Sequence, residues 1–380
     1  MPGRLPATGL LAAAALATLL AACGRPPPVA VHPADTPPER LSDWGVVLAD
    51  GRALEFNDGV IPYDLNTPLF SDYALKLRSV WMPAGASAQY RETGEFEFPV
   101  GTILSKTFHY ERAGERGGMP LDVVRADRES GLDADGQLDL DRYVLVETRL
   151  LVRYDEGWQA LPYVWNDTQD EAFLELAGDV RNIRLNDGRE QQPFVYVVPD
   201  ANQCGGCHKP DHTAAEMRPL GPRAWQLNRE YRYPEGPRNQ IEHWSAIGML
   251  AGAPESPPEG VRWAAPGDAS PGQRARAYLD ANCAHCHNAN GPADTSGLDL
   301  GIGAPLGRRY GICKPPVAVG RGSGDRPYDI YPGRPDESIM VYRMAHSDPA
   351  IAMPELGRST VHREGVELVR DWIAGLAGDC

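Results

Sequence analysis

One five-residue pattern occurs twice in this chain, and it limits what the sequence can form more than any other feature. The two copies are Cys204-Gly205-Gly206-Cys207-His208 and Cys283-Ala284-His285-Cys286-His287. With 7 cysteines and 9 histidines among 380 residues, random placement gives on the order of 0.003 copies per chain. The repeat therefore indicates a chemistry that needs two thiols and an adjacent imidazole, in two separate places.

The pattern Cys-X-X-Cys-His is typical of covalent haem attachment. The two thiols form thioether bonds to the vinyl groups of one haem, and the histidine becomes the proximal ligand of its iron. We therefore expect two c-type haems, and electron transfer as the leading function. A zinc site made from the four thiols is the alternative, and the histidine that follows each pair favours haem. The attachment residues are Cys204, Cys207, Cys283 and Cys286, and the proximal ligands are His208 and His287.

The first residues predict export. Arg4 precedes an apolar run, Leu10–Ala22, that is short for a membrane span and suits a signal peptide at residues 1–22. Small residues lead into Cys23, as in the bacterial lipoprotein cleavage box, so we expect Cys23 to be lipidated; ordinary signal cleavage nearby is the alternative. Gly24 in place of aspartate indicates the outer membrane. We expect an outer-membrane lipoprotein on the periplasmic side of the cell envelope, touching the membrane through its lipid anchor alone.

Composition divides the rest of the chain into a multidomain arrangement. We expect a proline-rich tether at 23–40, a β-rich domain at 41–198, a first haem region at 199–255 and a second haem domain at 256–380. The fold class expected is a sandwich or barrel-like β domain followed by mainly α-helical cytochrome c domains. The net charge of −15 argues against a nucleic-acid partner and suits a basic redox protein.

The β-rich region contains a hairpin signal and one acidic loop. Residues 143–154 and 158–165 alternate around the turn at 155–157, which predicts two antiparallel strands. The loop at 133–141 has alternating oxygen side chains that suit calcium. Its glycine comes too early for an EF-hand, so a solvated turn is favoured over a calcium site. The region shows no nucleophile motif.

Two helices are predicted around the second motif. Ser270, followed by proline and then by Gln273, forms a capping signal for a helix that ends near Asn282. Apolar residues at helical spacing between 366 and 376 predict a closing amphipathic helix. Between them, Met353-Pro354 resembles the distal-ligand loop of class I cytochromes c. We expect Met353 to be the sixth ligand of the second iron; a buried core methionine is the alternative.

The first motif has no single partner of this kind. Its candidate sixth ligands are Met217, Met249, His212 and His243, and a partly open iron is the alternative. The two cysteines that remain, Cys313 and Cys380, are expected to form a disulfide in an oxidising compartment, with free reactive thiols as the alternative.

From residue 41 to its end, the chain resembles a family of two-haem c-type cytochromes of Gram-negative bacteria that carry a β-rich region before the first haem. The segments that carry the resemblance are Gly59–Asn66, Phe98–Thr102, Glu147–Arg153 and Cys313–Ala318. The resemblance implies haem binding and electron transfer outside the cytoplasm, and it leaves the donor, the acceptor and the role of the β-rich region open. A dihaem peroxidase or oxygenase with one open iron is the competing function, and the lack of an evident acid–base pair weighs against it.

Overall fold

A computed structural model of the chain describes residues 26–114, 116, 121–126, 131–210, 214, 216–267, 269–317 and 320–380. The expected signal peptide, the expected lipidation site Cys23 and the candidate ligand His212 lie outside these residues. Within them, no helix has the length and apolar character needed to cross a membrane.

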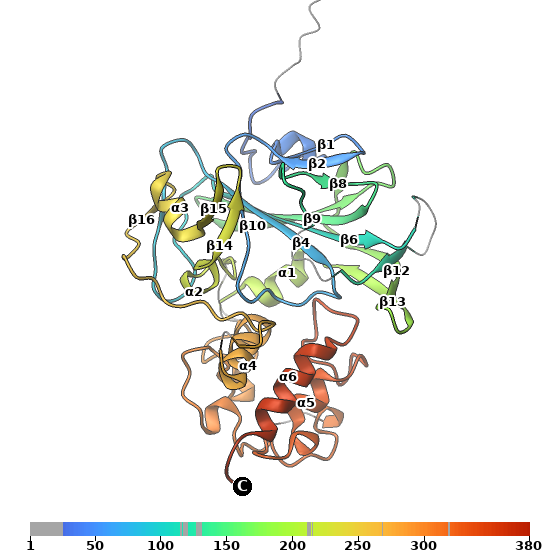
Figure 1. The fold of residues 1–380 in the computed structure, drawn as a ribbon, viewed down its shortest axis with the longest axis vertical. Coiled ribbons are helices and arrows are strands. Elements are labelled where there is room, and N and C mark those ends of the chain that lie inside the picture. Colours follow the sequence, from blue (N-terminus) through green and yellow to red (C-terminus); the bar gives the residue numbers. More distant parts are fainter. Residues whose placement is uncertain are drawn as a thin grey trace, which may run out of the picture.

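Strands dominate the first half of the chain and short helices the end (Figure 1). The strands are β1 Val47–Ala49, β2 Ala53–Phe56, β3 Ile61–Tyr63, β4 Leu75–Trp81, β5 Ala88–Gln89, β6 Ile103–Arg112, β7 Leu121–Val124, β8 Leu138–Asp139, β9 Tyr143–Tyr154, β10 Gly157–Trp165, β11 Ala172–Leu174, β12 Asp179–Asn186, β13 Gln191–Val198, β14 Glu230–Tyr233, β15 Gly236–Asn239 and β16 Leu250–Ala251. The α-helices are α1 Ala201–His208, α2 Ala224–Leu227, α3 Gln240–Ala246, α4 Pro271–Leu279, α5 Ile339–Met344 and α6 Arg363–Ala374.

One large sheet organises the N-terminal body. Among the described residues it contains nine strands, with the order β11-β10-β9-β6-β7-β12-β13 and with β4 also paired to β6 and β3 to β4. The predicted hairpin is confirmed, because β9 and β10 pair antiparallel from Tyr154 opposite Gly157 to Glu147 opposite Val164. Most neighbouring strands are antiparallel, and β7 with β12 is a parallel pair.

Both faces of the central strands β4, β6, β9 and β10 are largely buried, which explains their many apolar residues, whereas β12 and β13 expose one face. Successive side chains of a strand point to opposite faces. On β9, Val144 and Val146 pack in one cluster with Phe108, whereas Tyr143 and Leu145 pack in another. Burial on both sides fixes the register of the long strands, because a shift by one residue would exchange the two sets of side chains.

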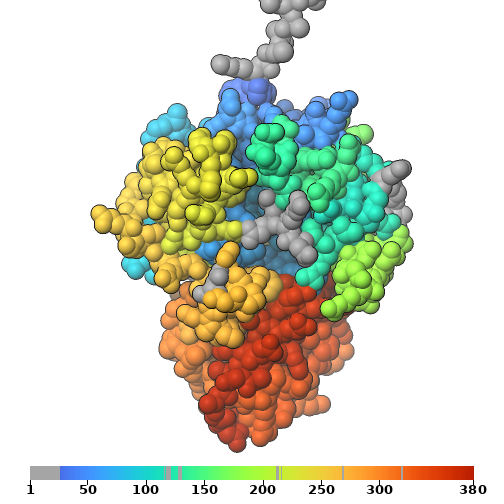
Figure 2. Space-filling model, in the orientation of Figure 1, coloured from blue at the N-terminus to red at the C-terminus, as the bar shows by residue number. Residues whose placement is uncertain are grey.

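The C-terminal part packs directly against the β-rich body, as Figure 2 shows for the orange and red segments. Its own core joins α4, α5 and α6 through Leu279, Val341, Val369 and Trp372. The two helices predicted from the capping signal and from the amphipathic spacing are both confirmed. Ser270 accepts a hydrogen bond from the backbone N–H of Gln273 at the start of α4, with the reciprocal bond also present.

The prediction of mainly α-helical cytochrome c domains is wrong. In the region expected to be the second haem domain, α4, α5 and α6 have 9, 6 and 12 residues and are separated by long loops. The region expected for the first haem contains the hairpin β14–β15 and strand β16 beside its short helices. Glycine and proline disfavour the interior of a helix, and the chain contains 40 glycines and 35 prolines, which is consistent with helices this short. Gly297 and Gly311, for example, end turns with positive φ.

A buried carboxylate joins the two halves of the molecule. Asp72, in the loop between β3 and β4, accepts hydrogen bonds from the backbone N–H groups of Ser359 and Thr360 and from the Thr360 hydroxyl. The distances to Asp72 Oδ1 are 2.8, 2.7 and 2.8 Å. Tyr73, beside it, donates to Glu364 at the start of α6. The segment before α6 is therefore held to the sheet by side chains of one short loop.

We predict that Asp72→Ala destabilises the protein by about 3 kcal/mol, because it leaves two buried N–H donors and a hydroxyl without an acceptor. Chemical denaturation measures the change in the free energy of unfolding. The control is Asp58→Ala, which removes an exposed carboxylate and is expected to change that energy by less than about 0.5 kcal/mol. Equal effects of the two variants would show that the Asp72 bonds do not hold the halves together.

Candidate functional site

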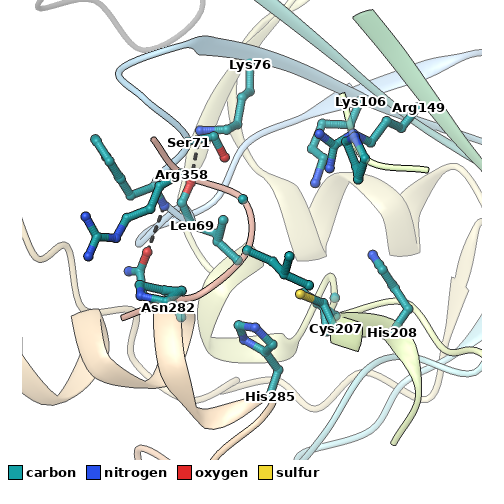
Figure 3. A pocket seen from close by; sticks show the side chains of 18 of the residues that line it. Leu69, Ser71, Lys76, Lys106, Arg149, Cys207, His208, Asn282, His285 and Arg358 are labelled. Atoms are coloured by element: carbon teal, nitrogen blue, oxygen red, sulfur yellow. Dashed lines mark hydrogen bonds between the residues drawn. The ribbon is translucent and has the colours of Figure 1, made fainter. Parts of the chain in front are cut away.

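A cavity of about 580 Å³ lies where the sheet meets the C-terminal part (Figure 3). Strands β4, β6, β9 and β10 contribute one wall. Helix α1 and residues 280–285 contribute another, and the loop 352–359 closes a third side. Both Cys-X-X-Cys-His motifs contribute to it, the first through Cys204, Cys207 and His208 and the second through Cys283 and His285.

The first motif occupies helix α1, directly after the edge strand β13. Asp200 caps this helix, accepting from the backbone N–H groups of Asn202 and Gln203 at 2.8 Å each, and the Gln203 side chain accepts from the Asp200 N–H. The cap fixes where the helix begins. Cys204 and Cys207, three residues apart on one short helix, consequently lie at the same cavity wall.

The second motif follows α4 through a single wide helical turn, Asp280–Ala284. The side chain of Asn282 donates to the Tyr278 carbonyl at 2.9 Å and accepts from the backbone N–H of Phe70 at 2.8 Å. This turn is therefore fastened both to α4 and to the loop that precedes β4. Asp280, in the same turn, pairs with Arg223 at 3.2 Å.

The two motifs touch each other although 79 positions separate Cys204 from Cys283. The thiol of Cys286 donates to the carbonyl oxygen of Gly206 at 3.5 Å. The neighbouring Cys286 thiol, and then His285, lowers the pKa of Cys207. The same contact with Cys207 raises the pKa of Cys286. In the described chain, one thiol of each motif thus lies against the other motif.

Each motif histidine is oriented through one ring nitrogen. His208 Nδ1 lies 2.8 Å from the carbonyl oxygen of Arg218, which can only accept, so Nδ1 carries the proton. His287 Nδ1 lies 2.9 Å from the Ser296 hydroxyl, which itself donates to the Ala293 carbonyl and so accepts from the ring. In both rings, Nε2 is left as the unprotonated nitrogen, the form that binds a metal.

The environment also keeps both rings neutral. Burial, and for His208 the charge of Lys106 as well, lowers the pKa of each imidazole to about 4. For His287, the positive charge of Arg343 lowers the pKa further. A neutral imidazole retains its lone pair, so both side chains can act as ligands over the ordinary range of pH.

The loop that carries Met353 borders the cavity, and Met353 and Leu356 line it. The carbonyl of Met353 accepts from the guanidinium of Arg358 at 2.7 Å, and the backbone N–H of Met353 donates to the backbone carbonyl of Arg343 at 3.1 Å. Met344, on α5, also lines the cavity. The loop position expected for a sixth ligand is therefore present, and ligation by Met353 stays a prediction.

The candidates for the first iron lie elsewhere. Met217 forms a bridge with Trp158, and Met249 packs with the apolar cluster around Trp244. His243 is buried and stacks on Tyr233 with ring centroids 3.7 Å apart. None of these three side chains lines the cavity among the described residues.

The cofactor prediction needs correction. Within the described ranges, no group of three or more His, Cys, Asp or Glu side chains is placed to hold a metal ion. We expected two haem irons, with calcium as a further candidate. The described side chains form no metal centre for either, and they form none for the alternative, zinc. In the acidic loop, Asp133 accepts from the N–H groups of Asp135 and Gln137, so this segment is a turn.

A disulfide joins Cys313 to Cys380, with 5.3 Å between their Cα atoms. It ties the end of the chain, after α6, to the loop before α5. Neither cysteine lines the cavity, so the bond contributes to the C-terminal part and not to the site.

Several cavity residues were not anticipated from the sequence. They are Lys76, Lys106, Arg149 and His362. Lys76, Lys106 and Arg149 each stand inside a strand segment rich in apolar and β-branched residues, and that was their only signal in the sequence. Nothing in the sequence showed that the three strands lie side by side or that these residues share one face.

Comparisons with protein-family models, with curated proteins and with solved structures give no match to this chain. The site is therefore interpreted from its own geometry and chemistry.

His362 gives a pH-dependent prediction. Its ring stacks on Phe70 at 4.2 Å and meets the Tyr278 hydroxyl at 2.9 Å. Burial lowers its pKa to about 3, far below the value near 6.5 in the unfolded chain. Between these values the unfolded chain binds more protons, so stability falls as the pH falls from about 6.5.

In His362→Gln we expect the slope of unfolding free energy against pH between 6 and 4 to decrease by about 1.4 kcal/mol per pH unit. Denaturant titrations at several pH values measure it. His32→Gln, in the N-terminal segment, serves as the control. An unchanged slope in His362→Gln would mean that His362 is not held neutral by its surroundings.

Proposed function

We propose that this chain is an exported electron-transfer protein of the two-haem c type. The observation that supports it best is the meeting of both Cys-X-X-Cys-His motifs at one cavity, with Cys286 of the second against Gly206 and Cys207 of the first. Two attachment sites in contact suit a protein that moves electrons from one centre to the next.

The residues present fit such a group. A porphyrin supplies four ligands to its own iron, so each motif needs to offer only a histidine and, at most, one further residue. When bound, each haem supplies a one-electron couple between ferrous and ferric iron.

The chain's own groups have defined tasks in this proposal. The two cysteines of each motif would hold one haem through two thioether bonds, one from each thiol. The Arg218 carbonyl and the Ser296 hydroxyl orient His208 and His287, so that little rearrangement accompanies a change of charge. The surrounding sheet and the loop 352–359 form the walls of the cavity that the motifs share.

The cellular location and the charge of the redox partner are part of the same proposal. We place the protein on the periplasmic side of the envelope, held to the outer membrane by a lipid at Cys23, among two-haem cytochromes with a preceding β-rich region. The net charge of −15 suits a basic redox partner and no nucleic acid.

One observation favours the second candidate function, a dihaem enzyme with an open iron. Near the first motif, Met217, Met249 and His243 do not line the cavity within the described part of the chain. If no residue closes the first iron, a small molecule such as a peroxide has access to it. Electron transfer remains the first choice because the sequence offers no evident acid–base pair for such an enzyme.

We predict that the exported protein keeps haem through denaturing electrophoresis, because thioether bonds survive unfolding. Cys204→Ala/Cys207→Ala and Cys283→Ala/Cys286→Ala are each expected to retain about half of the haem staining, and the quadruple variant none. Cys313→Ser/Cys380→Ser, which removes two cysteines outside the motifs, is the control and keeps full staining. A wild-type protein without covalent haem would disprove the proposed function.

A second prediction concerns Met353. Met353→Ala should remove a methionine-to-iron absorption band from the spectrum of the oxidised protein, because the sulfur is lost as sixth ligand. The matched control is Met344→Ala, a second methionine of the same cavity. If Met344→Ala and not Met353→Ala removes the band, α5 carries the ligand instead of the loop.

A further inference from the structure

Three cations lie in register across three neighbouring strands. Arg78 on β4 is directly opposite Lys106 on β6, and Lys106 is directly opposite Arg149 on β9. All three line the cavity, and Figure 3 shows Lys106 and Arg149 together on its sheet side. Like charges directly opposite each other destabilise a sheet, so this row needs compensation.

The two outer members have it. Arg78 pairs with Asp64 at 2.8 Å, and Arg149 makes two bonds to Glu147, at 2.7 and 2.6 Å. Both pairs are largely buried, and Tyr196 donates a further bond to Glu147. These carboxylates therefore offset the charges at the two ends of the row.

The central member has no such partner. Lys106 forms no ion pair with a described residue, and its Nζ lies 5.1 Å from the centre of the Phe108 ring. Lys76 lies on β4, two residues before Arg78, and also lines the cavity. It donates to the backbone carbonyls of Leu69 and Ala74, which carry no full charge. An enclosed ammonium group without a counter-charge is costly, and burial lowers the pKa of Lys106 to about 7.

The sign of the charge inside the cavity is opposite to that of the whole chain. The chain has a net charge of −15, yet its cavity wall presents Lys76, Lys106 and Arg358 in addition to the paired arginines. The carboxylates on the same wall already have partners: Asp72 accepts from the Ser359 and Thr360 backbone, Asp280 pairs with Arg223, and Glu355 pairs with Arg343. Arg358 hydrogen-bonds only backbone carbonyls among the contacts described for it. An acidic protein that concentrates unpaired cations in one enclosed space has a place for an anion there.

We propose that Lys106 is the centre of a carboxylate-binding subsite inside the cavity, with Lys76 as its neighbour. A carboxylate between these ammonium groups supplies the missing counter-charge through charge-assisted hydrogen bonds. It also relieves the row Arg78–Lys106–Arg149. The subsite lies on the sheet wall, opposite the thiols of the first motif.

Two sources of carboxylate share this chemistry. One is the pair of propionate groups on a covalently attached haem, and this version rests on the proposed function. The other is a small free carboxylate that enters the cavity. The subsite itself follows from the cation row and does not depend on which source fills it.

The test uses the full exported protein and three variants. Lys106→Met removes the charge and keeps the length, and Lys106→Arg keeps the charge. Lys209→Met removes a lysine that follows the first motif directly but does not line the cavity. Because Lys106→Met also removes a like-charge contact from the sheet, it is expected to fold and to be at least as resistant to denaturant as the wild type.

Two readouts separate the sources. Equilibrium dialysis with radiolabelled succinate reports binding of a free carboxylate. We expect the wild type and Lys106→Arg to bind succinate. Lys106→Met should bind it at least about tenfold more weakly, because one charge-assisted hydrogen bond is lost. Redox-difference infrared spectra of protein whose haem propionates carry carbon-13 report the attached source: the labelled carboxylate band shifts in Lys106→Met. Lys209→Met leaves both readouts unchanged.

If Lys106→Met changes one of the two readouts, that readout identifies the source of the carboxylate and supports the subsite. If Lys106→Met matches the wild type in both readouts, or if Lys209→Met changes them equally, the proposal is overturned. Covalent haem staining is recorded on the same samples. Absence of stain would refute the proposed function, while succinate binding would still decide on the subsite.

Discussion

The docking of the C-terminal part onto the sheet is the constraint on which the site depends. Asp72 holds the backbone before α6, and Asn282 holds the turn that carries the second motif. Without these contacts the motifs would have no common cavity, because α1 follows the last strand of the sheet and Cys283 lies in the turn after α4. A loop of the β-rich body thus sets the distance between two motifs that are far apart in the sequence.

Charge is distributed to suit that arrangement. The outer surface carries the negative excess of the chain, whereas cations gather on the cavity wall of the sheet. Burial keeps His208 and His287 neutral, and fixed hydrogen bonds at Nδ1 leave Nε2 available. Neutral imidazoles therefore lie beside a basic wall in the same part of the molecule.

Local patterns were sufficient for the elements and insufficient for their assembly. Ser270 and Gln273 predicted the start of α4, and alternation predicted the β9–β10 hairpin, because both signals act between near neighbours. The helical cytochrome domains were wrong, since a haem motif and two flanking helices do not specify the loops between them. The row around Lys106 could not be predicted either, because it depends on strand order, and no local pattern fixes which strands become neighbours.

The contact between the motifs can be tested most directly by electron paramagnetic resonance. If two haems are attached as proposed, the nearness of the two motifs predicts that the ferric signals broaden each other in the fully oxidised protein, and that reduction of one centre sharpens the signal of the other. A spectrum equal to the sum of two independent centres at every stage of reduction would contradict the shared cavity. A protein without any iron signal would contradict the proposed function as a whole.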